Sequence, residues 1–152
     1  PEALDRVRAL GDSVRAQERE IARLKQELAK AKLGDVASQA VALEGGARLV
    51  AVRMDDLDGN ELRAVAESIL DKLGADGVAV AAGASEGRVN IVAACGKNAS
   101  QRYAAGKIVN ALAQPLGGKG GGKPTLAQAG AKDAEKLGEV MDAAAATIDS
   151  IA

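Results

Sequence analysis

The chain has 152 residues, a formal net charge of −1, no histidine, one cysteine and one aromatic residue, Tyr103. The lack of histidine excludes Ser-His, Cys-His and metal-His sites within this chain. A single thiol excludes an internal disulfide framework, and a single tyrosine nearly rules out base stacking on an aromatic platform.

The start of the sequence and its hydropathy indicate a piece of a longer protein. The chain begins at Pro1 without an initiator Met, so we expect an excised fragment. It has no apolar run long enough to span a bilayer and no signal-peptide pattern. Its lone Cys95 suits a reducing compartment. We therefore expect a cytoplasmic protein with one compact domain and an extension.

Residues 1–34 are expected to form a helical, coiled-coil-like stalk, because small and apolar residues recur there at alternating steps of four and three. The repeat consists of Ala3, Val7, Leu10, Val14, Gln17, Ile21, Leu24, Leu28 and Ala31. We expect self-association through a dimer seam formed by Val7, Leu10, Val14, Ile21, Leu24 and Leu28. Gly11 and the polar Gln17 weaken the repeat, and the alternative is one amphipathic helix lying on its own protein.

The next segment combines two strands and a helix. Gly34 is expected to end the stalk, and two strand-like segments follow, at 36–43 and 47–54. The diglycine Gly45-Gly46 between them indicates a hairpin. Asp58 and Glu61 have the spacing of a capping box for a helix over 59–73, which Gly74 would end.

The remaining elements complete the order ββαββα, loop, α. Strands are expected at 78–82 and 89–94, joined by a turn over 83–87, and a helix is expected to start near Ser100. A glycine-rich loop over 117–122 precedes a last helix that opens at Asp133. That helix is expected to bury Leu137, Val140, Met141, Ala144, Ile148 and Ile151. The order predicts an α+β domain over 35–152, with a mixed or antiparallel sheet and packed helices.

The charges are segregated along the chain. From residue 97 to residue 132 there is no Asp or Glu, and the stretch carries Lys97, Arg102, Lys107, Lys119, Lys123 and Lys132. An acid-free basic block in a near-neutral chain is typical of a site that binds a polyanion.

Two motifs resemble chemical sites, but neither has the full set of residues that its chemistry needs. Residues 117–123 spell G-G-K-G-G-G-K, which matches the start of a phosphate-binding loop, but Pro124 replaces the Ser or Thr that holds magnesium. A cluster at Asp55, Asp56 and Asp58 lacks the glycine that a calcium loop needs at its sixth position, so helix capping explains it better. No acid–base pair emerges, and Cys95 at the end of an apolar strand is an ordinary buried thiol.

Residues 117–130 resemble a signature near the C-terminus of alanyl-tRNA synthetases. The run Gly117 to Pro124, followed by Ala127-Gln128-Ala129-Gly130, is similar to that family's glycine run, basic residue, proline and Met-Ala-Gln-Ala-Gly-Gly. Lys97, Arg102 and Ala105-Gly106 are also similar to the family. The chain departs from the pattern at Thr125, Leu126 and Ala131. The resemblance covers residues 36–152, and a preceding coiled coil also fits it.

The resemblance implies a DHH-associated C-terminal domain that binds tRNA at its outer corner, the elbow, and helps aminoacylation and editing to use one tRNA. It implies a fragment with no catalytic residues, metal or cofactor of its own, whereas the parent ligase would use ATP, Mg and Zn. The rest of the synthetase and alanine-specific tRNA are the implied partners. The related phosphoesterases place a histidine after a glycine pair, and this chain has none.

We therefore expect an RNA-binding surface in which lysines contact phosphates and bare glycine backbone permits close approach. It consists of Lys97, Arg102, Lys107, Lys119, Gly120, Gly121, Gly122, Lys123 and Lys132. Recognition would rest mainly on shape. The alternative is an oligomerisation module of the synthetase, which acts through the coiled coil and the globular part.

Overall fold

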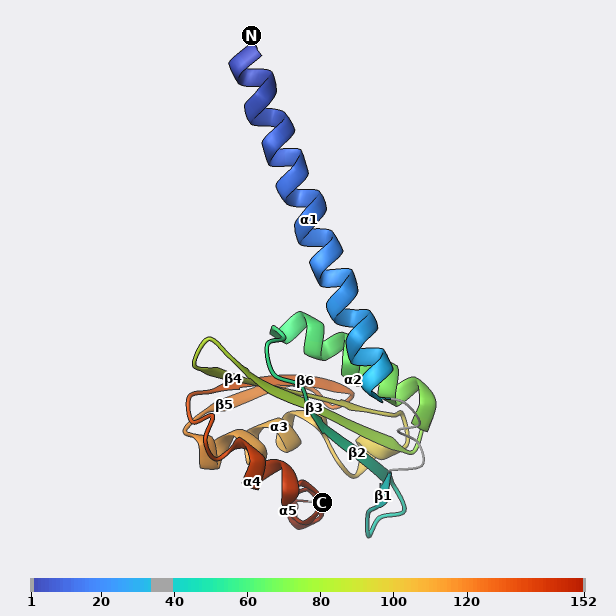
Figure 1. Ribbon diagram of the computed structural model, residues 1–152. Coiled ribbons are helices and arrows are strands. Elements are labelled where there is room, and N and C mark those ends of the chain that lie inside the picture. The colour runs from blue at the N-terminus through green and yellow to red at the C-terminus, as the bar shows by residue number, and fades with distance from the viewer. Residues whose placement is uncertain (1, 34–39, 152) are drawn as a thin grey trace.

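The computed structural model describes residues 2–33 and 40–151 and has a six-stranded sheet with helices on both faces (Figure 1). The strands are β1 (Val41–Ala42), β2 (Arg48–Arg53), β3 (Gly77–Ser85), β4 (Arg88–Cys95), β5 (Lys119–Lys123) and β6 (Leu126–Ala131). The helices are α1 (Glu2–Leu33), α2 (Gly59–Leu73), α3 (Ala105–Ala113), α4 (Leu137–Asp142) and α5 (Ala144–Ile151), with short 3-10 helices η2 (Ala99–Gln101) and η3 (Gln114–Leu116). The expected α+β class is confirmed.

The sheet is mixed, with the strand order β1-β2-β3-β4-β6-β5. Among the described strands only β2 and β3 pair in parallel, and α2 connects them, as parallel neighbours require a crossover. The other pairs are antiparallel, and the expected hairpins β1–β2 and β3–β4 are both present. The β3–β4 turn is tighter than expected, because both strands extend to the Glu86-Gly87 pair.

The core has two layers, one on each face of the sheet. Alternate residues of β3 point to opposite faces, so Val78 and Val80 pack in one layer while Ala79 and Ala81 pack in the other. The first layer lies under α3, α4 and α5, and the second lies under α2 (Figure 1). The central strands are buried on both sides, which explains their continuous run of small apolar residues.

The local signals for α2 are confirmed in full. The Asp58 side chain accepts a hydrogen bond from the Glu61 N–H (2.8 Å), and the Glu61 carboxylate accepts one from the Asp58 N–H (3.5 Å). Gly74, with φ of 82°, ends the helix at the expected position. The stripe Leu62, Val65, Ala66, Ile69 and Leu73 is buried.

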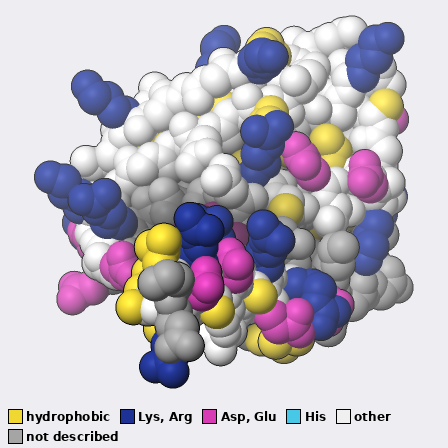
Figure 2. All heavy atoms as spheres, turned by 90° about the horizontal axis from the view of Figure 1, so that it is seen from above, with side chains coloured by type: hydrophobic (Ala, Val, Ile, Leu, Met, Phe, Trp, Pro, Cys, Tyr) yellow, Lys and Arg dark blue, Asp and Glu magenta, His cyan; other side chains and the backbone are white. Residues whose placement is uncertain are grey.

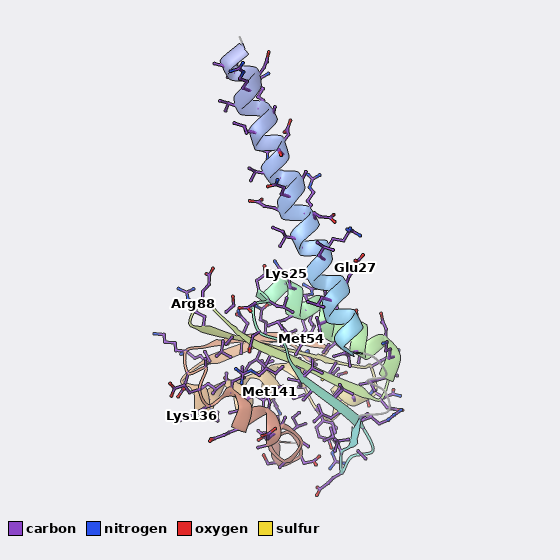
Figure 3. All side chains as sticks on the ribbon, viewed as in Figure 1. Lys25, Glu27, Met54, Arg88, Lys136 and Met141 are labelled. Atoms are coloured by element: carbon purple, nitrogen blue, oxygen red, sulfur yellow. The ribbon has the colours of Figure 1, made fainter. Side chains whose placement is uncertain are left out.

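The helix α1 extends far beyond the globular body, and its lower end lies beside α2 (Figure 1). Lys25 donates a hydrogen bond from Nζ to the Asp56 carbonyl (3.2 Å), in the turn before α2, and Figure 3 shows Lys25 on this side of the helix. The expected seam residues Val7, Leu10, Val14, Ile21, Leu24 and Leu28 are between 50% and 66% exposed. Residues 34–39, which contain the expected end of the stalk and the start of the first strand, lie outside the described residues.

The helix expected near Ser100 begins later, at Ala105. A 3-10 turn, η2, precedes this helix. Tyr103, between the two, is buried in the core, and its hydroxyl group makes hydrogen bonds on both sides. The Gly45 N–H donates to the Tyr103 hydroxyl (2.9 Å), which itself donates to Asp149 Oδ1 (3.1 Å). These contacts tie the β1–β2 turn to α5 through one phenol.

Two further expectations were wrong at the C-terminal end. The glycine-rich segment 117–122, expected as a loop, contributes most of strand β5, and β6 follows it. The single last helix expected from Asp133 is two helices, α4 and α5, which meet at Ala143. Asp133 instead accepts a hydrogen bond from the Lys136 N–H (3.4 Å), so it caps the turn before α4. Leu137, Ala144 and Ile148 are buried as expected, and Val140, Met141 and Ile151 are half-buried.

The Asp55 carboxylate links the end of β2 to β3 and predicts a loss of stability in acid. Its Oδ1 accepts hydrogen bonds from the Ala84 N–H (2.9 Å) and from Arg53 Nε (3.1 Å). The first of these is the main cause that lowers the pKa of Asp55 below its ordinary value of 3.8. A lowered folded-state pKa stabilises the fold above the unfolded value, and this contribution is lost as pH falls through the folded value.

We therefore expect Asp55→Asn to lower the urea midpoint at pH 7 and to differ less from the unmodified chain below about pH 3. Urea unfolding followed by circular dichroism at both pH values measures this. The same change at Asp71, an exposed residue of α2, serves as the control. A deficit for Asp55→Asn that stays constant down to pH 2 would contradict this role.

Candidate nucleic-acid interface

Strand β5 forms because its glycines fit against small residues of β6. In the antiparallel register, Gly120 lies opposite Ala129 and Gly122 lies opposite Ala127. A Cβ atom added at Gly120 would overlap Ala129, and one added at Gly122 would lie 2.7 Å from the Ala127 Cα. A Cβ at Gly121 would meet nothing within 4 Å. Two of the three glycines are therefore required by packing, and the third leaves an open patch of backbone.

The alternation along β5 assigns its lysines to one face. Gly120 and Gly122 face the layer under α3, together with the buried alanines of β6. Lys119, Gly121 and Lys123 consequently lie on the opposite face, the face that carries α2. Because α2 packs on β3 and β4, Lys119, Gly121 and Lys123 of β5 and both Gln128 and Gly130 of β6 stay exposed on this face.

The exposed β5–β6 sheet face contains a groove of about 210 Å³ beside α2. Arg63, Val92, Gly121, Gly122, Leu126, Ala127 and Gln128 line it. Figure 2 looks onto the side of the molecule that carries α1 and α2. Its upper part is an expanse of backbone and uncharged polar side chains with Lys and Arg along its margin, while Asp and Glu lie lower in the view and toward the right.

The structure brings Lys97, Lys107 and Lys123 to one end of the β5–β6 hairpin. The Cys95 N–H, two residues before Lys97, donates to the Thr125 carbonyl (2.9 Å). The Ala105 N–H, two residues before Lys107, donates to the Pro124 carbonyl (2.9 Å). Both bonds end in the turn that follows Lys123. We call Lys97, Lys107 and Lys123 the turn-end lysines, and all three are exposed.

Lys119 and Lys132 lie at the other end of the same hairpin. Lys119 pairs with Gly130, two residues before Lys132, and the Lys132 N–H donates to the Leu116 carbonyl (3.4 Å). Four strand steps separate Lys119 from Lys123, which corresponds to about 13 Å. Cations therefore stand at both ends of the glycine strand, with bare backbone between them.

Arg102 is not part of this group. Its guanidinium lies over the Tyr103 ring, 5.7 Å from the centroid, and its side chain approaches Gly45 in the β1–β2 turn. The strand order places β1 and β2 at the sheet edge opposite to β5. Arg102 therefore belongs to a separate part of the surface, although the sequence places it within the basic block.

From the sequence, Arg63, Gln128 and Gly130 were not assigned to the binding surface. The segment Ala127-Gln128-Ala129-Gly130-Ala131 alternates buried and exposed residues, and this period of two is a strand signal. It also assigns Gln128 and Gly130 to the solvent side. No comparable signal marks Arg63, because its place in the groove depends on how α2 packs across the sheet.

Two kinds of reactive group depend on their surroundings in the described residues: clusters of possible metal ligands and the one thiol. Within them, no group of three or more His, Cys, Asp or Glu side chains could hold a metal ion. Cys95 is buried, and this burial raises the pKa of its thiol to about 12, so the reactive thiolate is disfavoured. In the part of the chain that the structure describes, no helix is long and apolar enough to cross a membrane.

Comparisons with known proteins give the relatives of this chain. The DHHA1 domain family matches residues 46–150. The chain is 42% identical to an alanine–tRNA ligase of Synechococcus sp., covering 94% of this chain and 16% of that protein. It is 35% identical to an alanine–tRNA ligase of Solibacter usitatus, covering 99% of this chain and 17% of that protein. The chain thus spans about a sixth of the length of these relatives.

Solved structures share the fold. The C-Ala domain of Aquifex aeolicus alanyl-tRNA synthetase superposes with a TM-score of 0.64 at 22% identity, covering 72% of this chain and 96% of that domain. A DHH domain from a member of the s1p family of ribosomal proteins superposes with a TM-score of 0.53 at 20% identity, covering 85% of this chain and 31% of that one.

Proposed function

The chain belongs to the DHHA1 domain family, and from this premise we propose that it is the C-terminal tRNA-binding appendage of an alanine–tRNA ligase. In this proposal the appendage has no catalytic site of its own. It binds the elbow of tRNA and so helps aminoacylation and editing to act on one tRNA. Chemistry that needs ATP, Mg or Zn belongs to other parts of the parent ligase.

The observation that carries the proposal is the β5–β6 sheet face. Lysines stand at both ends of a glycine strand whose outer face is open at Gly121. A lysine acts as a point charge on phosphate, and a strand without side chains lets a sugar-phosphate backbone approach closely. Few groups on this face can read base edges, so it is suited to the shape of a folded RNA.

The test is a binding experiment with deacylated tRNA, in which an acceptor-stem minihelix and duplex DNA compete. We expect whole tRNA to bind and neither competitor to displace it at equal concentration, because neither contains the elbow. Each binding curve is repeated across a salt titration. Equal and steeply salt-dependent binding of all three nucleic acids would contradict elbow recognition and reduce the surface to a generic basic patch.

The exposed seam of α1 supports oligomerisation as a second function. Apolar side chains such as Leu10 (66% exposed) and Leu28 (57%) form an exposed stripe at coiled-coil spacing, which the polar Gln17 interrupts. An apolar stripe of this kind is normally covered by a partner. We propose self-association through this helix, and light scattering on the 152-residue chain tests it. A monomer at high concentration would contradict it without affecting the proposal of tRNA binding.

A further inference from the structure

The groove beside α2 differs from the rest of the β5–β6 sheet face in having an apolar floor. Val92 and Leu126 form that floor, and Gly121, Gly122 and Ala127 complete the lining. Arg63 of α2 and Gln128 of β6 supply the polar groups. Phosphate binding would not need an apolar floor, whereas the flat face of a nucleobase is well matched to one.

The setting of Arg63 decides how its guanidinium can act. Its Nε donates to Glu67 Oε1 at 3.1 Å, one turn along α2, so much of its charge is already balanced. The side chain is still 54% exposed, which leaves the planar guanidinium accessible. A nearby carboxylate disfavours a phosphate but not a stacked base. Guanidinium planes stack on bases where aromatic rings are lacking, and Tyr103, the chain's one aromatic residue, is buried.

Gln128 is placed to read a base edge in the same groove. Its side chain lies against Gly59 at the start of α2, where an added Cβ atom would overlap the carboxamide. Gly59 and Arg63 are four residues apart and so lie on the same side of α2. The carboxamide carries two donors and one acceptor, which suits the edge of a base.

We propose that this groove holds one unpaired or helix-terminal nucleobase of the bound tRNA, with Arg63 stacked on its face and Gln128 hydrogen-bonded to its edge. The inference rests on the proposed tRNA binding and deepens it. It divides the surface into two parts. The lysines bind phosphates and set the salt dependence of binding. The groove contacts a base and does not contribute to the salt dependence.

The test compares deacylated-tRNA binding across a salt titration by the unmodified chain and by Arg63→Gln, Arg63→Lys and Gln128→Ala. We expect each variant to bind about tenfold more weakly with an unchanged salt slope. Arg63→Lys is the decisive variant, because it keeps the charge but removes the plane. Arg15→Gln, at an exposed position of α1, is the control and should bind like the unmodified chain. Circular dichroism verifies that every variant is folded.

Every outcome of this experiment either supports or overturns the proposal that the groove binds a base. Full affinity in Arg63→Lys, or a salt slope reduced by about one in Arg63→Gln, would assign Arg63 to a phosphate and overturn the inference. Unchanged affinity in Arg63→Gln or Gln128→Ala would also overturn it. If Lys123→Ala weakens binding in the same series, the proposed function survives that result. If the unmodified chain binds no tRNA, the proposed function fails and this inference fails with it.

Discussion

Replacement of the turn-end lysines, Lys97, Lys107 and Lys123, by alanine is expected to lower tRNA affinity by about two orders of magnitude at 0.1 M salt. Each phosphate contact releases counterions, so losing three contacts should reduce the slope of log affinity against log salt by about two to three. The segments that carry the three residues border one turn, so their charges add at this end of the hairpin. Equilibrium binding at four or more salt concentrations measures both quantities.

A matched control removes the same charge elsewhere. Arg8, Arg15 and Arg19 on α1 are exposed cations away from the β5–β6 sheet face. Their triple replacement by alanine changes the net charge by the same amount. We expect it to leave the salt slope almost unchanged. Equal losses in the two triple variants would mean that net charge, and not this surface, governs binding.

Substitution of neighbouring glycines in β5 is expected to separate folding from binding. Gly120→Ala forces a methyl group into Ala129 of the paired strand, and overpacking of this kind costs about 1–3 kcal/mol of the free energy of unfolding. Gly121→Ala places its methyl group in open space and should change that free energy by less than about 0.5 kcal/mol. The second substitution should instead weaken tRNA binding, since it blocks close approach of the RNA backbone.

Urea unfolding and tRNA binding of both variants test this contrast. If Gly120→Ala is as stable as the unmodified chain, β5 does not pack on β6 in the described register. If Gly121→Ala is stable and binds tRNA with full affinity, the RNA does not approach the strand at this point.

The parts of the fold that could be predicted from the sequence depend on local signals. The capping box of Asp58 and Glu61 and the terminal Gly74 defined α2 to the residue, because neighbours in sequence supply the hydrogen bonds that begin and end this helix. The β3–β4 hairpin followed from two apolar runs around one turn. The parallel pairing of β2 with β3 could not be predicted in this way, because it depends on how α2 crosses the sheet.

Strand β5 shows why local preference fails at this site. Glycine disfavours a strand on its own, so three consecutive glycines indicate a loop. The strand exists because β6 presents Ala127 and Ala129, which leave room only for glycine. Its stability therefore comes from a partner strand and not from its own residues.

The charged residues of the candidate site could be found by counting, but their grouping could not. The absence of acidic residues over 97–132 is visible in the sequence. The separation of Arg102 from the turn-end lysines depends on the strand order. Arg63 and Gln128 are 65 residues apart in the sequence, and only the packing of α2 over the sheet brings both to one groove.

Hydroxyl-radical footprinting of deacylated tRNA bound to the 152-residue chain tests the central claim most directly, because it reports where the RNA backbone is covered. If the chain binds the elbow as proposed, we expect protection confined to the outer corner of the folded tRNA. We also expect that protection to be lost when the turn-end lysines are replaced by alanine. Protection of the acceptor stem instead of the corner, or a corner footprint that persists in the triple variant, would contradict this proposal.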